Sequence, residues 1–392
     1  MRQFLLIQIL LTLSLFFSTN SLNAEPAQVN EEESLPPQLE ILIGGTTLPA
    51  SITSALNAVL GNNFNIAIDN ANAELESYDS FRKLAKGFGN ANACASNAGT
   101  LQGYQDYSLF AITTGIMLGV QLPSIEEEYY NDLADKVKDD GDLYAGASPG
   151  ISIVNLGINA GSLYEGLYFN LKLGYLSLSP VDGLNVKSTL LGFGLNYSLI
   201  RTGKVLFGFL KWRGISLGTG FLYNKSEIEL EVDLSDEIDP VPFEYTPTDA
   251  SYSAYTISGN LVLDPSFIVG IDSNTYTIPF DISTSVRMLW IINFNLGGGV
   301  DLNFGSSEFF IKASGKTTLE DTNISGGLPA THNVTPGNIV IEGSSDKVSP
   351  SFARPKITTG LGINFGPVKI DVPIVYYLTK SFAIGLTVGV VW

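Results

Sequence analysis

The chain ends with the sequence SFAIGLTVGVVW, residues 381–392. Large apolar side chains occupy every even position from Phe382 to Trp392, whereas the odd positions carry mostly small residues such as Gly385 and Gly389. A period of two residues places alternate side chains on opposite faces of a β-strand. The segment therefore predicts a strand with one strongly apolar face and one face of small side chains.

The same alternation recurs along the chain after residue 106. At about 20 residues for each strand and its loop, residues 107–392 hold about 14 strands, and we predict a count of 12–14. From Tyr276 to Leu296 the large apolar residues stay at even positions almost throughout, so the pattern does not show where the chain turns. The segments that favour strands are 107–121, 149–162, 165–179, 186–200, 204–233, 252–263, 267–283, 285–304, 307–314, 338–344, 356–366, 368–378 and 381–392.

The composition of the two faces distinguishes a membrane barrel from a soluble sheet. A soluble sandwich would carry charged residues on its second face, but here that face is mostly Gly, Ser, Ala and Asn, and only 15% of the chain is charged. Aromatic residues such as Tyr197, Tyr223 and Trp392 lie toward strand ends, which is typical of the girdles of membrane barrels. We therefore predict an all-β fold, an antiparallel transmembrane β-barrel, with a periplasmic β-sandwich as the alternative.

The first 24 residues have the pattern of a secretory signal peptide. Arg2 precedes an apolar run from Phe4 to Phe17, and residues 21–24, Ser-Leu-Asn-Ala, end in a small residue. We predict cleavage after Ala24 and a location in the outer membrane of a diderm bacterium. The final strand ends in an aromatic residue, so we expect the barrel-assembly machinery of that membrane to recognise Trp392.

The composition argues against several classes of function. The formal net charge of −18 disfavours nucleic acid as a partner. Residues 214–218 match the G-x-S-x-G motif of hydrolases, but Ser216 lies within a predicted strand and the sole histidine is His332. The acidic residues of 139–142 are too few for a calcium loop. We therefore expect no enzymatic activity, no metal and no cofactor, and we interpret Cys94 as a small buried residue.

Residues 25–106 differ in pattern from the rest of the chain. Residues 25–38 form an acidic, proline-containing linker, and Asn70 to Lys86 predict a helix that Asn70 begins and Gly87 ends. Residues 88–100 are rich in small and amide side chains and cannot build a core alone. We predict that this segment lies inside the barrel as a plug; a flexible periplasmic linker is the alternative. The domain organisation is thus a signal peptide (1–24), a linker and plug (25–106) and a barrel (107–392).

This layout resembles that of the FadL-like outer-membrane transporters of fatty acids and other hydrophobic compounds. The resemblance covers Phe88 to Trp392 and consists of a small-residue segment before the first strand, roughly 14 alternating strands and a terminal aromatic residue. The Asn-Pro-Ala motif of that family's plug is replaced here by residues 90–93, Asn-Ala-Asn-Ala. The resemblance implies capture of an apolar ligand, passage beneath a plug that changes conformation, and sideways release.

The function that we predict is uptake of hydrophobic or amphipathic small molecules, such as long-chain fatty acids, through a barrel gated by its plug. The expected partners are the lipid bilayer and an apolar ligand, and the residues expected to bind that ligand are Phe88, Asn90, Asn92, Tyr104 and Phe110. A nonspecific porin is one alternative, although porins carry charged residues at their constriction and we expect few charges on the inward faces. A structural or adhesive surface barrel is another.

Overall fold

The computed structural model describes residues 25–29, 33–76, 81–100, 107–122, 145–181, 183–201, 203–205, 209–233, 240–326 and 329–392. The helices are α2 (Ala50–Glu76) and α3 (Phe81–Ala95). The strands are β1 (Glu25–Val29), β2 (Gln38–Ile43), β3 (Thr46–Thr47), β4 (Phe110–Gln121), β5 (Gly146–Asn159), β6 (Leu167–Val181), β7 (Leu184–Ile200), β8 (Gly203–Val205), β9 (Leu210–Asp233), β10 (Val241–Tyr245), β11 (Thr256–Met288), β12 (Ile292–Ser325), β13 (Ala330–Thr335), β14 (Gly337–Ser344), β15 (Ala353–Phe365), β16 (Val368–Tyr377) and β17 (Ser381–Val391). The predicted signal peptide and Tyr104 lie outside the described residues.

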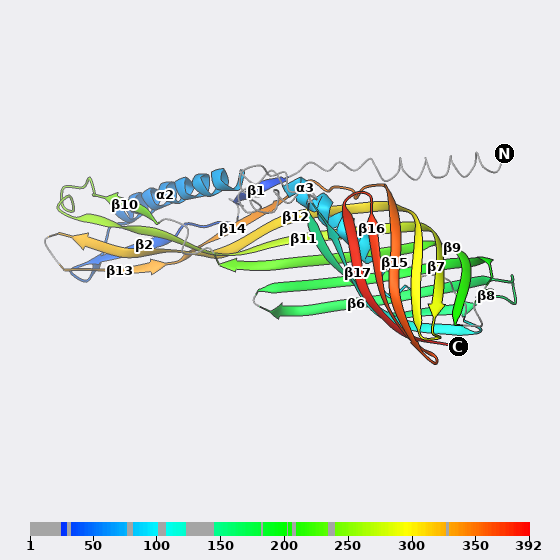
Figure 1. Ribbon diagram of the computed structural model, residues 1–392. Coiled ribbons are helices and arrows are strands. Elements are labelled where there is room, and N and C mark those ends of the chain that lie inside the picture. Colours follow the sequence, from blue (N-terminus) through cyan, green and yellow to red (C-terminus); the bar gives the residue numbers. More distant parts are fainter. Residues whose placement is uncertain are drawn as a thin grey trace.

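The described strands form a closed antiparallel barrel (Figure 1). The main sheet has 14 strands, which agrees with the predicted 12–14. Within it a continuous circle of pairings joins ten strands, β4, β5, β6, β7, β9, β11, β12, β15, β16 and β17. The final pairing, β17 with β4, extends from Ser381 and Gln121 to Val391 and Ala111. The circle uses ten strands because β11 and β12, with 33 and 34 residues, are much longer than the average assumed above.

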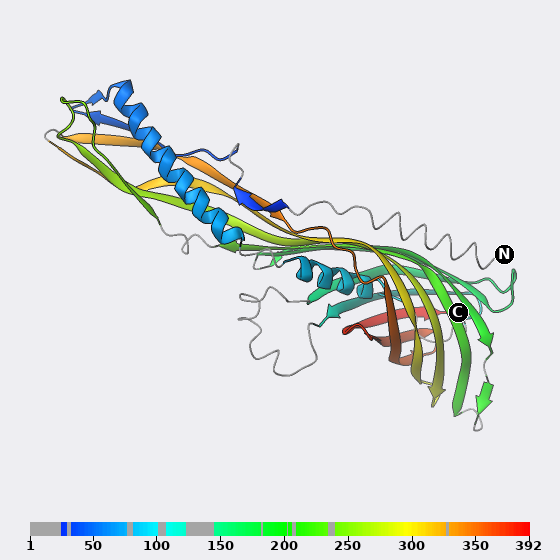
Figure 2. The same cartoon turned by 90° about the horizontal axis from the view of Figure 1, so that it is seen from above.

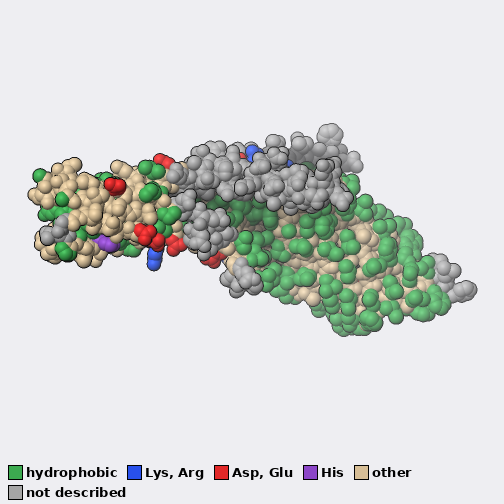
Figure 3. Space-filling model, turned by 60° about the vertical axis from the view of Figure 1, so that its left-hand side comes forward, with side chains coloured by type: hydrophobic (Ala, Val, Ile, Leu, Met, Phe, Trp, Pro, Cys, Tyr) green, Lys and Arg blue, Asp and Glu red, His purple; other side chains and the backbone are tan. Residues whose placement is uncertain are grey.

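The outside of the barrel is apolar, as the alternation predicts (Figure 3). Ile116, Phe193 and Leu361 are each more than half exposed on this surface. On β11 the outward face is largely apolar from Tyr276 to Met288, about 40 Å along the strand at roughly 3.3 Å per residue. A strand tilt near 40° reduces that to about 30 Å, the thickness of a bilayer's hydrocarbon core. The exposed apolar surface is therefore a lipid-facing belt.

One mouth of the barrel, which we call the turn end, carries the connection between the two longest strands. The loop between β11 and β12 consists of Leu289, Trp290 and Ile291, of which the first two have positive φ values of 50° and 62°. After a loop of three residues the outward-facing positions of the next strand are again even-numbered. This explains why the sequence pattern did not locate the turn. The C-terminal residue Trp392 lies at the same mouth and stacks on Phe110, with 5.0 Å between the ring centroids.

At the opposite mouth, β11 and β12 continue far beyond the ring and form an elongated extension (Figures 1 and 2). β10 pairs with β11, and β14 and β1 continue the sheet beyond β12. A separate sheet, β13-β2-β3, and helix α2 complete the extension. Its apolar core includes Leu39, Ile41, Leu56, Leu60 and Phe64, all at most 2% exposed. The predicted separate strands at 252–263 and 267–283, and at 285–304 and 307–314, belong instead to these two long strands.

The predicted helix over residues 70–86 is wrong. Asn70 lies inside α2, and Gly87 lies inside α3, which continues to Ala95. Gly87 allows close packing rather than ending the helix, because a Cβ atom there would lie 2.2 Å from the carbonyl oxygen of Ala145. Residues 25–47 also do more than link, since they contribute β1, β2 and β3. Neither described helix is both long and apolar enough to span a membrane.

Candidate functional site

Helix α3 enters the barrel from the mouth that carries the extension (Figure 2). Arg82 and Lys83 at its start are exposed, whereas every residue from Gly89 to Gly99 is buried. The described chain then continues at the turn end, where the amide of Leu109 donates to the carbonyl of Trp392 at 2.9 Å. Residues 89–100 therefore lie in the lumen, and the described residues that follow, from Tyr107, lie toward the other mouth, ahead of the first barrel strand.

Small residues allow α3 to lie directly against the barrel wall. A Cβ atom at Gly119 on β4 would lie 2.1 Å from the carbonyl oxygen of Ala91, and one at Gly150 on β5 would lie 2.1 Å from that of Ala95. Both distances are far below a normal van der Waals contact. Alanines on the helix and glycines on the strands thus let the two backbones approach closely. The small side chains of residues 88–100 therefore serve close packing of the helix against the barrel wall.

Two asparagines attach α3 to different parts of the wall. The side chain of Asn90 donates to Gln121 Oε1 on β4 at 3.1 Å and accepts a bond from the backbone amide of Ser351 at 2.8 Å. Asn92 donates to the backbone carbonyl of Asn224 on β9 at 2.8 Å and accepts from Ser148 on β5 at 3.0 Å. Residues two apart on a helix point in nearly opposite directions. The pair therefore holds the helix across the lumen.

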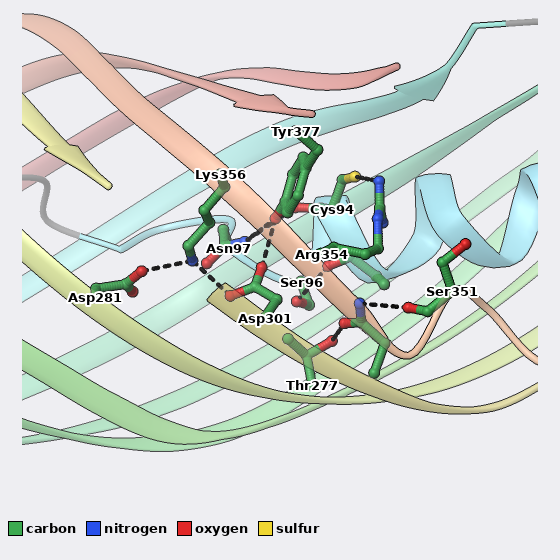
Figure 4. Close-up of polar contacts among 12 residues, drawn as sticks. Cys94, Ser96, Asn97, Thr277, Asp281, Asp301, Ser351, Arg354, Lys356 and Tyr377 are labelled. Carbon is green, nitrogen blue, oxygen red and sulfur yellow. Dashed lines mark hydrogen bonds and ion pairs between the residues drawn. The ribbon is translucent and has the colours of Figure 1, made fainter. Parts of the chain in front are cut away.

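Arg354 on β15 is fully buried and binds the same helix (Figure 4). Its guanidinium donates to the backbone carbonyl of Asn90 at 2.7 Å, to Cys94 Sγ at 3.2 Å and to the hydroxyl of Ser381. The group also lies 4.2 Å from the ring centroid of Tyr377. We call Arg354 and its partners Asn90, Cys94, Tyr377 and Ser381 the anchor cluster.

A network of charged residues lies next to the anchor cluster (Figure 4). The ammonium of Lys356 lies 2.8 Å from a carboxylate oxygen of Asp281 and 2.7 Å from one of Asp301. The hydroxyl of Tyr377 donates to the other oxygen of Asp301 at 2.6 Å and accepts from Asn97 at 3.3 Å. Because Asn97 follows α3 directly, the network connects the plug to β11, β12, β15 and β16.

A small cavity lies beside the end of the plug. It measures about 60 Å³, and its lining includes Asn97, Asn155, Lys172 and Asp281. The ammonium of Lys172 donates to the carbonyl of Ser96 at 3.3 Å and to the hydroxyl of Thr100. A water molecule needs roughly 10–15 Å³ of such space. The cavity can therefore hold a few waters but not a long-chain compound.

The expectation of few inward charges is wrong. Among the described residues that are buried and charged, five are basic and two are acidic, and all lie on strands of the ring: Lys172, Arg213, Arg354, Lys356, Lys369, Asp301 and Asp371. The sequence did contain the signal. Arg354 and Lys356 share the parity of Gly360 and Gly362, so they belong to the inward face of their strand.

The five predicted ligand-binding residues do not lie together. Asn90 and Asn92 bind the wall as described, and Phe88 packs against the core of the extension. Phe110 lies at the turn end against Trp392, at the opposite end of the lumen from Phe88. Tyr104 is outside the described residues. Contact of these residues with a ligand therefore stays a prediction, and their positions do not define a single pocket.

The residues considered for catalysis are also separated. Ser216 is buried within β9, inside the ring, whereas His332 lies in β13, which pairs with β2 in the extension. His332 consequently cannot serve as a base for Ser216. Cys94 is fully buried in α3, which confirms its interpretation as a small buried residue.

The closed ring, the lipid-facing belt and the helix in the lumen define an outer-membrane β-barrel with an internal plug. The family model described as Lsa36-like matches residues 38–392, so the chain belongs to the Lsa36-like family. No curated protein matches the sequence.

Several solved outer-membrane proteins are similar to the chain, all at low identity. The translocator domain of the autotransporter NalP from Neisseria meningitidis has 10% identity and a TM-score of 0.27, with 74% of this chain and 90% of that one covered. The toluene transporter TodX of P. putida has 9% identity and a TM-score of 0.23, with 79% and 99% covered. A FadL homologue of Pseudomonas aeruginosa has 8% identity and a TM-score of 0.23, with 77% and 98% covered.

Proposed function

We propose that the protein is an outer-membrane uptake channel in which α3 is the gate. The observation that carries the proposal is the burial of residues 89–99 inside the lumen, where they lie between the two mouths. With α3 in place the cavity beside it holds only about 60 Å³. Passage of a larger solute past the buried residues 89–99 would then require movement of the helix, which favours a gated channel over an open porin.

The way in which α3 is held favours movement. Asn90, Asn92 and Asn97 bind the wall through hydrogen bonds, and Arg354 binds the helix backbone and Cys94. A net hydrogen bond between neutral groups contributes only about 0.5–1.5 kcal/mol, and one to a charged group such as Arg354 about 1.5–3 kcal/mol, because water can replace either partner. The small alanine and glycine contacts bury little apolar surface, so hydration of the lumen offsets much of the cost of withdrawing the helix.

The solutes that we propose are hydrophobic or amphipathic small molecules such as long-chain fatty acids. Among these the amphipathic molecules with an anionic head are favoured, because buried basic residues exceed buried acidic ones on the inward faces of the described strands. A wholly apolar compound would offer these charged groups no polar partner.

The test replaces residues 88–103 with a glycine–serine linker of equal length. A linker is needed because the chain passes through the lumen, so a deletion would pull the extension against the barrel. Uptake of a labelled long-chain fatty acid into proteoliposomes should lose its selectivity over a labelled neutral sugar in the linker variant. Equal uptake of the two compounds by the wild-type protein would contradict the proposal.

The extension favours a second candidate function, a surface-exposed structural or adhesive role. Single-chain outer-membrane barrels have short periplasmic turns and longer extracellular loops. By that rule the turn end is periplasmic, and the extension, with α2 and its own core, projects outside the cell. Protease added to intact cells should then cleave within α2. Protection of the extension in intact cells would count against this role.

A further inference from the structure

Lys172 on β6 is a buried cation that pairs with no carboxylate among the described residues. The residue is 4% exposed. Its ammonium donates to the carbonyl of Ser96 and to the hydroxyl of Thr100, which are both neutral and belong to the plug segment. An ammonium has three N–H donors, so these two bonds leave one of them unused. A buried charge is costly unless an opposite charge compensates it.

The cavity of about 60 Å³ beside the end of the plug is lined in part by Lys172. Asp281 is the sole carboxylate among the described residues of the lining, and it lies 2.8 Å from the ammonium of Lys356 instead (Figure 4). The negative charge of Asp281 is therefore already compensated. A carboxylate group on a molecule in the cavity would give Lys172 the opposite charge that it lacks.

Asn155 on β5 adds an unused hydrogen-bond acceptor to the same lining. It pairs with Lys172 in the register of β5 and β6, and both residues are buried. Its Nδ2 atom donates to the carbonyl of Gly99 at 2.8 Å and to the hydroxyl of Thr113 at 3.2 Å. Its Oδ1 atom is buried and has no partner among the described residues. Because buried polar atoms are nearly always bonded, a suitable ligand carries a donor for this oxygen as well as a carboxylate.

The volume of the cavity and the charge of Lys172 narrow the choice of ligand. A water molecule, with its one non-hydrogen atom, needs roughly 10–15 Å³ of such space. About 60 Å³ therefore has room for roughly four to six non-hydrogen atoms. An amino group as the donor would be protonated and would bring a second positive charge beside Lys172, whereas a hydroxyl is neutral. A hydroxyl on the carbon next to the carboxylate satisfies both limits.

We propose that this cavity binds a small carboxylate whose neighbouring carbon carries a hydroxyl group. The site lies between the wall and the plug, because Asn97 and Thr100 belong to its lining. A ligand that binds only when both parts are in place stabilises the plugged state. The ligand therefore holds the gate closed and is not itself the transported solute. This effect on the gate rests on the proposed function, whereas binding in the cavity does not.

Titration calorimetry on the full mature protein in neutral detergent, at constant ionic strength, tests the binding. The probes are glycolate, acetate, which lacks the hydroxyl, and glycine, which replaces it with an ammonium. We expect saturable binding of glycolate, and binding of acetate that is about two- to tenfold weaker because one hydrogen bond is lost. Absence of glycolate binding, or equally tight binding of acetate or glycine, would overturn the inference. Uptake and conductance without these compounds would be unaffected, so the gate is tested separately.

Two substitutions with opposite expected effects assign the binding to the cavity. Lys172→Gln removes the cation and should weaken glycolate binding by about tenfold or more, whereas Asp281→Asn removes a carboxylate of the lining and should strengthen it. Lys369→Gln removes another buried lysine of the ring, outside the described lining, and is the matched control with unchanged affinity. Heat-dependent gel mobility verifies that each barrel is folded. Unchanged affinity in Lys172→Gln, or weaker binding in Asp281→Asn, would overturn the assignment.

The effect on the plug is measured through Cys94, which lies in α3 and is fully buried. Glycolate at ten times its dissociation constant should slow alkylation of Cys94 by maleimide about tenfold, because the ligand must leave before the plug moves. The variant with a glycine–serine linker in place of residues 88–103 lacks Asn97 and Thr100 and should not bind glycolate. Unchanged alkylation would overturn the effect on the gate, and glycolate binding by the linker variant would overturn the position of the site.

Discussion

β11 belongs to two regions, the extension and the barrel, and its inward face has opposite character in each. In the extension the odd positions are buried and apolar, namely Ile257, Leu261, Leu263 and Ile271. In the barrel the odd positions are buried and polar, namely Ser273, Thr275 and Thr277. The outward face changes in the opposite sense, from Ser258 and Asp264 to Phe280 and Ile282. Along this one strand the inward face therefore changes from apolar to polar, and the outward face changes from polar to apolar.

The exchange occurs at the same level on neighbouring strands. Ile271 pairs with Ile228 on β9 and with Phe309 on β12. One step further toward the barrel, serines lie side by side on four strands, and all are buried: Ser188, Ser226, Ser273 and Ser307. This row of serines marks where a polar lumen, surrounded by lipid, gives way to an apolar core, surrounded by water.

The two helices follow the same division. α2 lies in the extension and buries Ile52, Leu56 and Leu60 in an apolar core. α3 lies in the lumen and is held by asparagines, Arg354 and close backbone contacts. Apolar burial has no substitute in water, whereas hydrogen bonds do. This difference supports the proposal that α3 moves while α2 remains a fixed part of the extension.

The largest effect is expected from Leu56→Ala in α2. Removal of a fully buried leucine should destabilise the extension by about 2–5 kcal/mol, because a cavity remains in its core. Hydrogen exchange of the α2 amides measures this loss. Conductance in planar bilayers should stay at the wild-type level, since Leu56 does not contact the lumen. A rise in conductance would mean that the two helices are not independent.

A smaller effect, confined to α3, is expected from Arg354→Gln. The variant loses charge-assisted bonds to Asn90, Cys94 and Ser381, each worth about 1.5–3 kcal/mol when buried. Cys94 is the sole cysteine and is fully buried, so maleimide should modify it slowly in the wild-type protein. We expect alkylation to be about tenfold faster in the variant. Identical rates would show that Arg354 does not hold the plug.

The smallest effect comes from one substitution made in each helix. Gly61→Ala in α2 meets open space and should stabilise that helix by about 0.5–1 kcal/mol. Gly87→Ala in α3 meets the backbone of Ala145 and should cost on the order of 1 kcal/mol. Hydrogen exchange of each helix separates the two outcomes. Stabilisation of α3 by Gly87→Ala would refute the close packing of plug and wall.

Sequence reasoning predicted the barrel because lipid imposes a strict alternation, as in residues 381–392. It did not predict the extension. In strands 256–288 and 292–325 the same positions face inward along the whole strand, but the inward face is apolar in the extension and polar in the barrel. α2 had a visible signal in Ile52, Leu56, Leu60 and Phe64, which recur at four-residue spacing. The end of a helix was predicted wrongly at Gly87, because glycine is common both at helix ends and at sites of close packing. The sequence alone does not distinguish these two roles.

The contents of the lumen were harder to predict than its wall. The plug segment 88–100 was recognised from its small residues, yet the partners of Asn90 and Asn92 lie on strands more than 25 residues away in sequence. Inward charges such as Lys356 and Asp301 come together only when β12 and β15 pair in their three-dimensional register. Their parity indicates the direction of each side chain, but the choice of partner depends on the three-dimensional register.

The conductance of single molecules in planar bilayers tests the gate most directly. Wild-type protein is compared with the variant in which a glycine–serine linker of equal length replaces residues 88–103, and Leu56→Ala serves as a control for damage elsewhere. We predict a low conductance for the wild type and for Leu56→Ala, and a several-fold higher conductance for the linker variant. Equal conductance of the linker variant and the wild type would contradict the central claim that α3 closes the lumen.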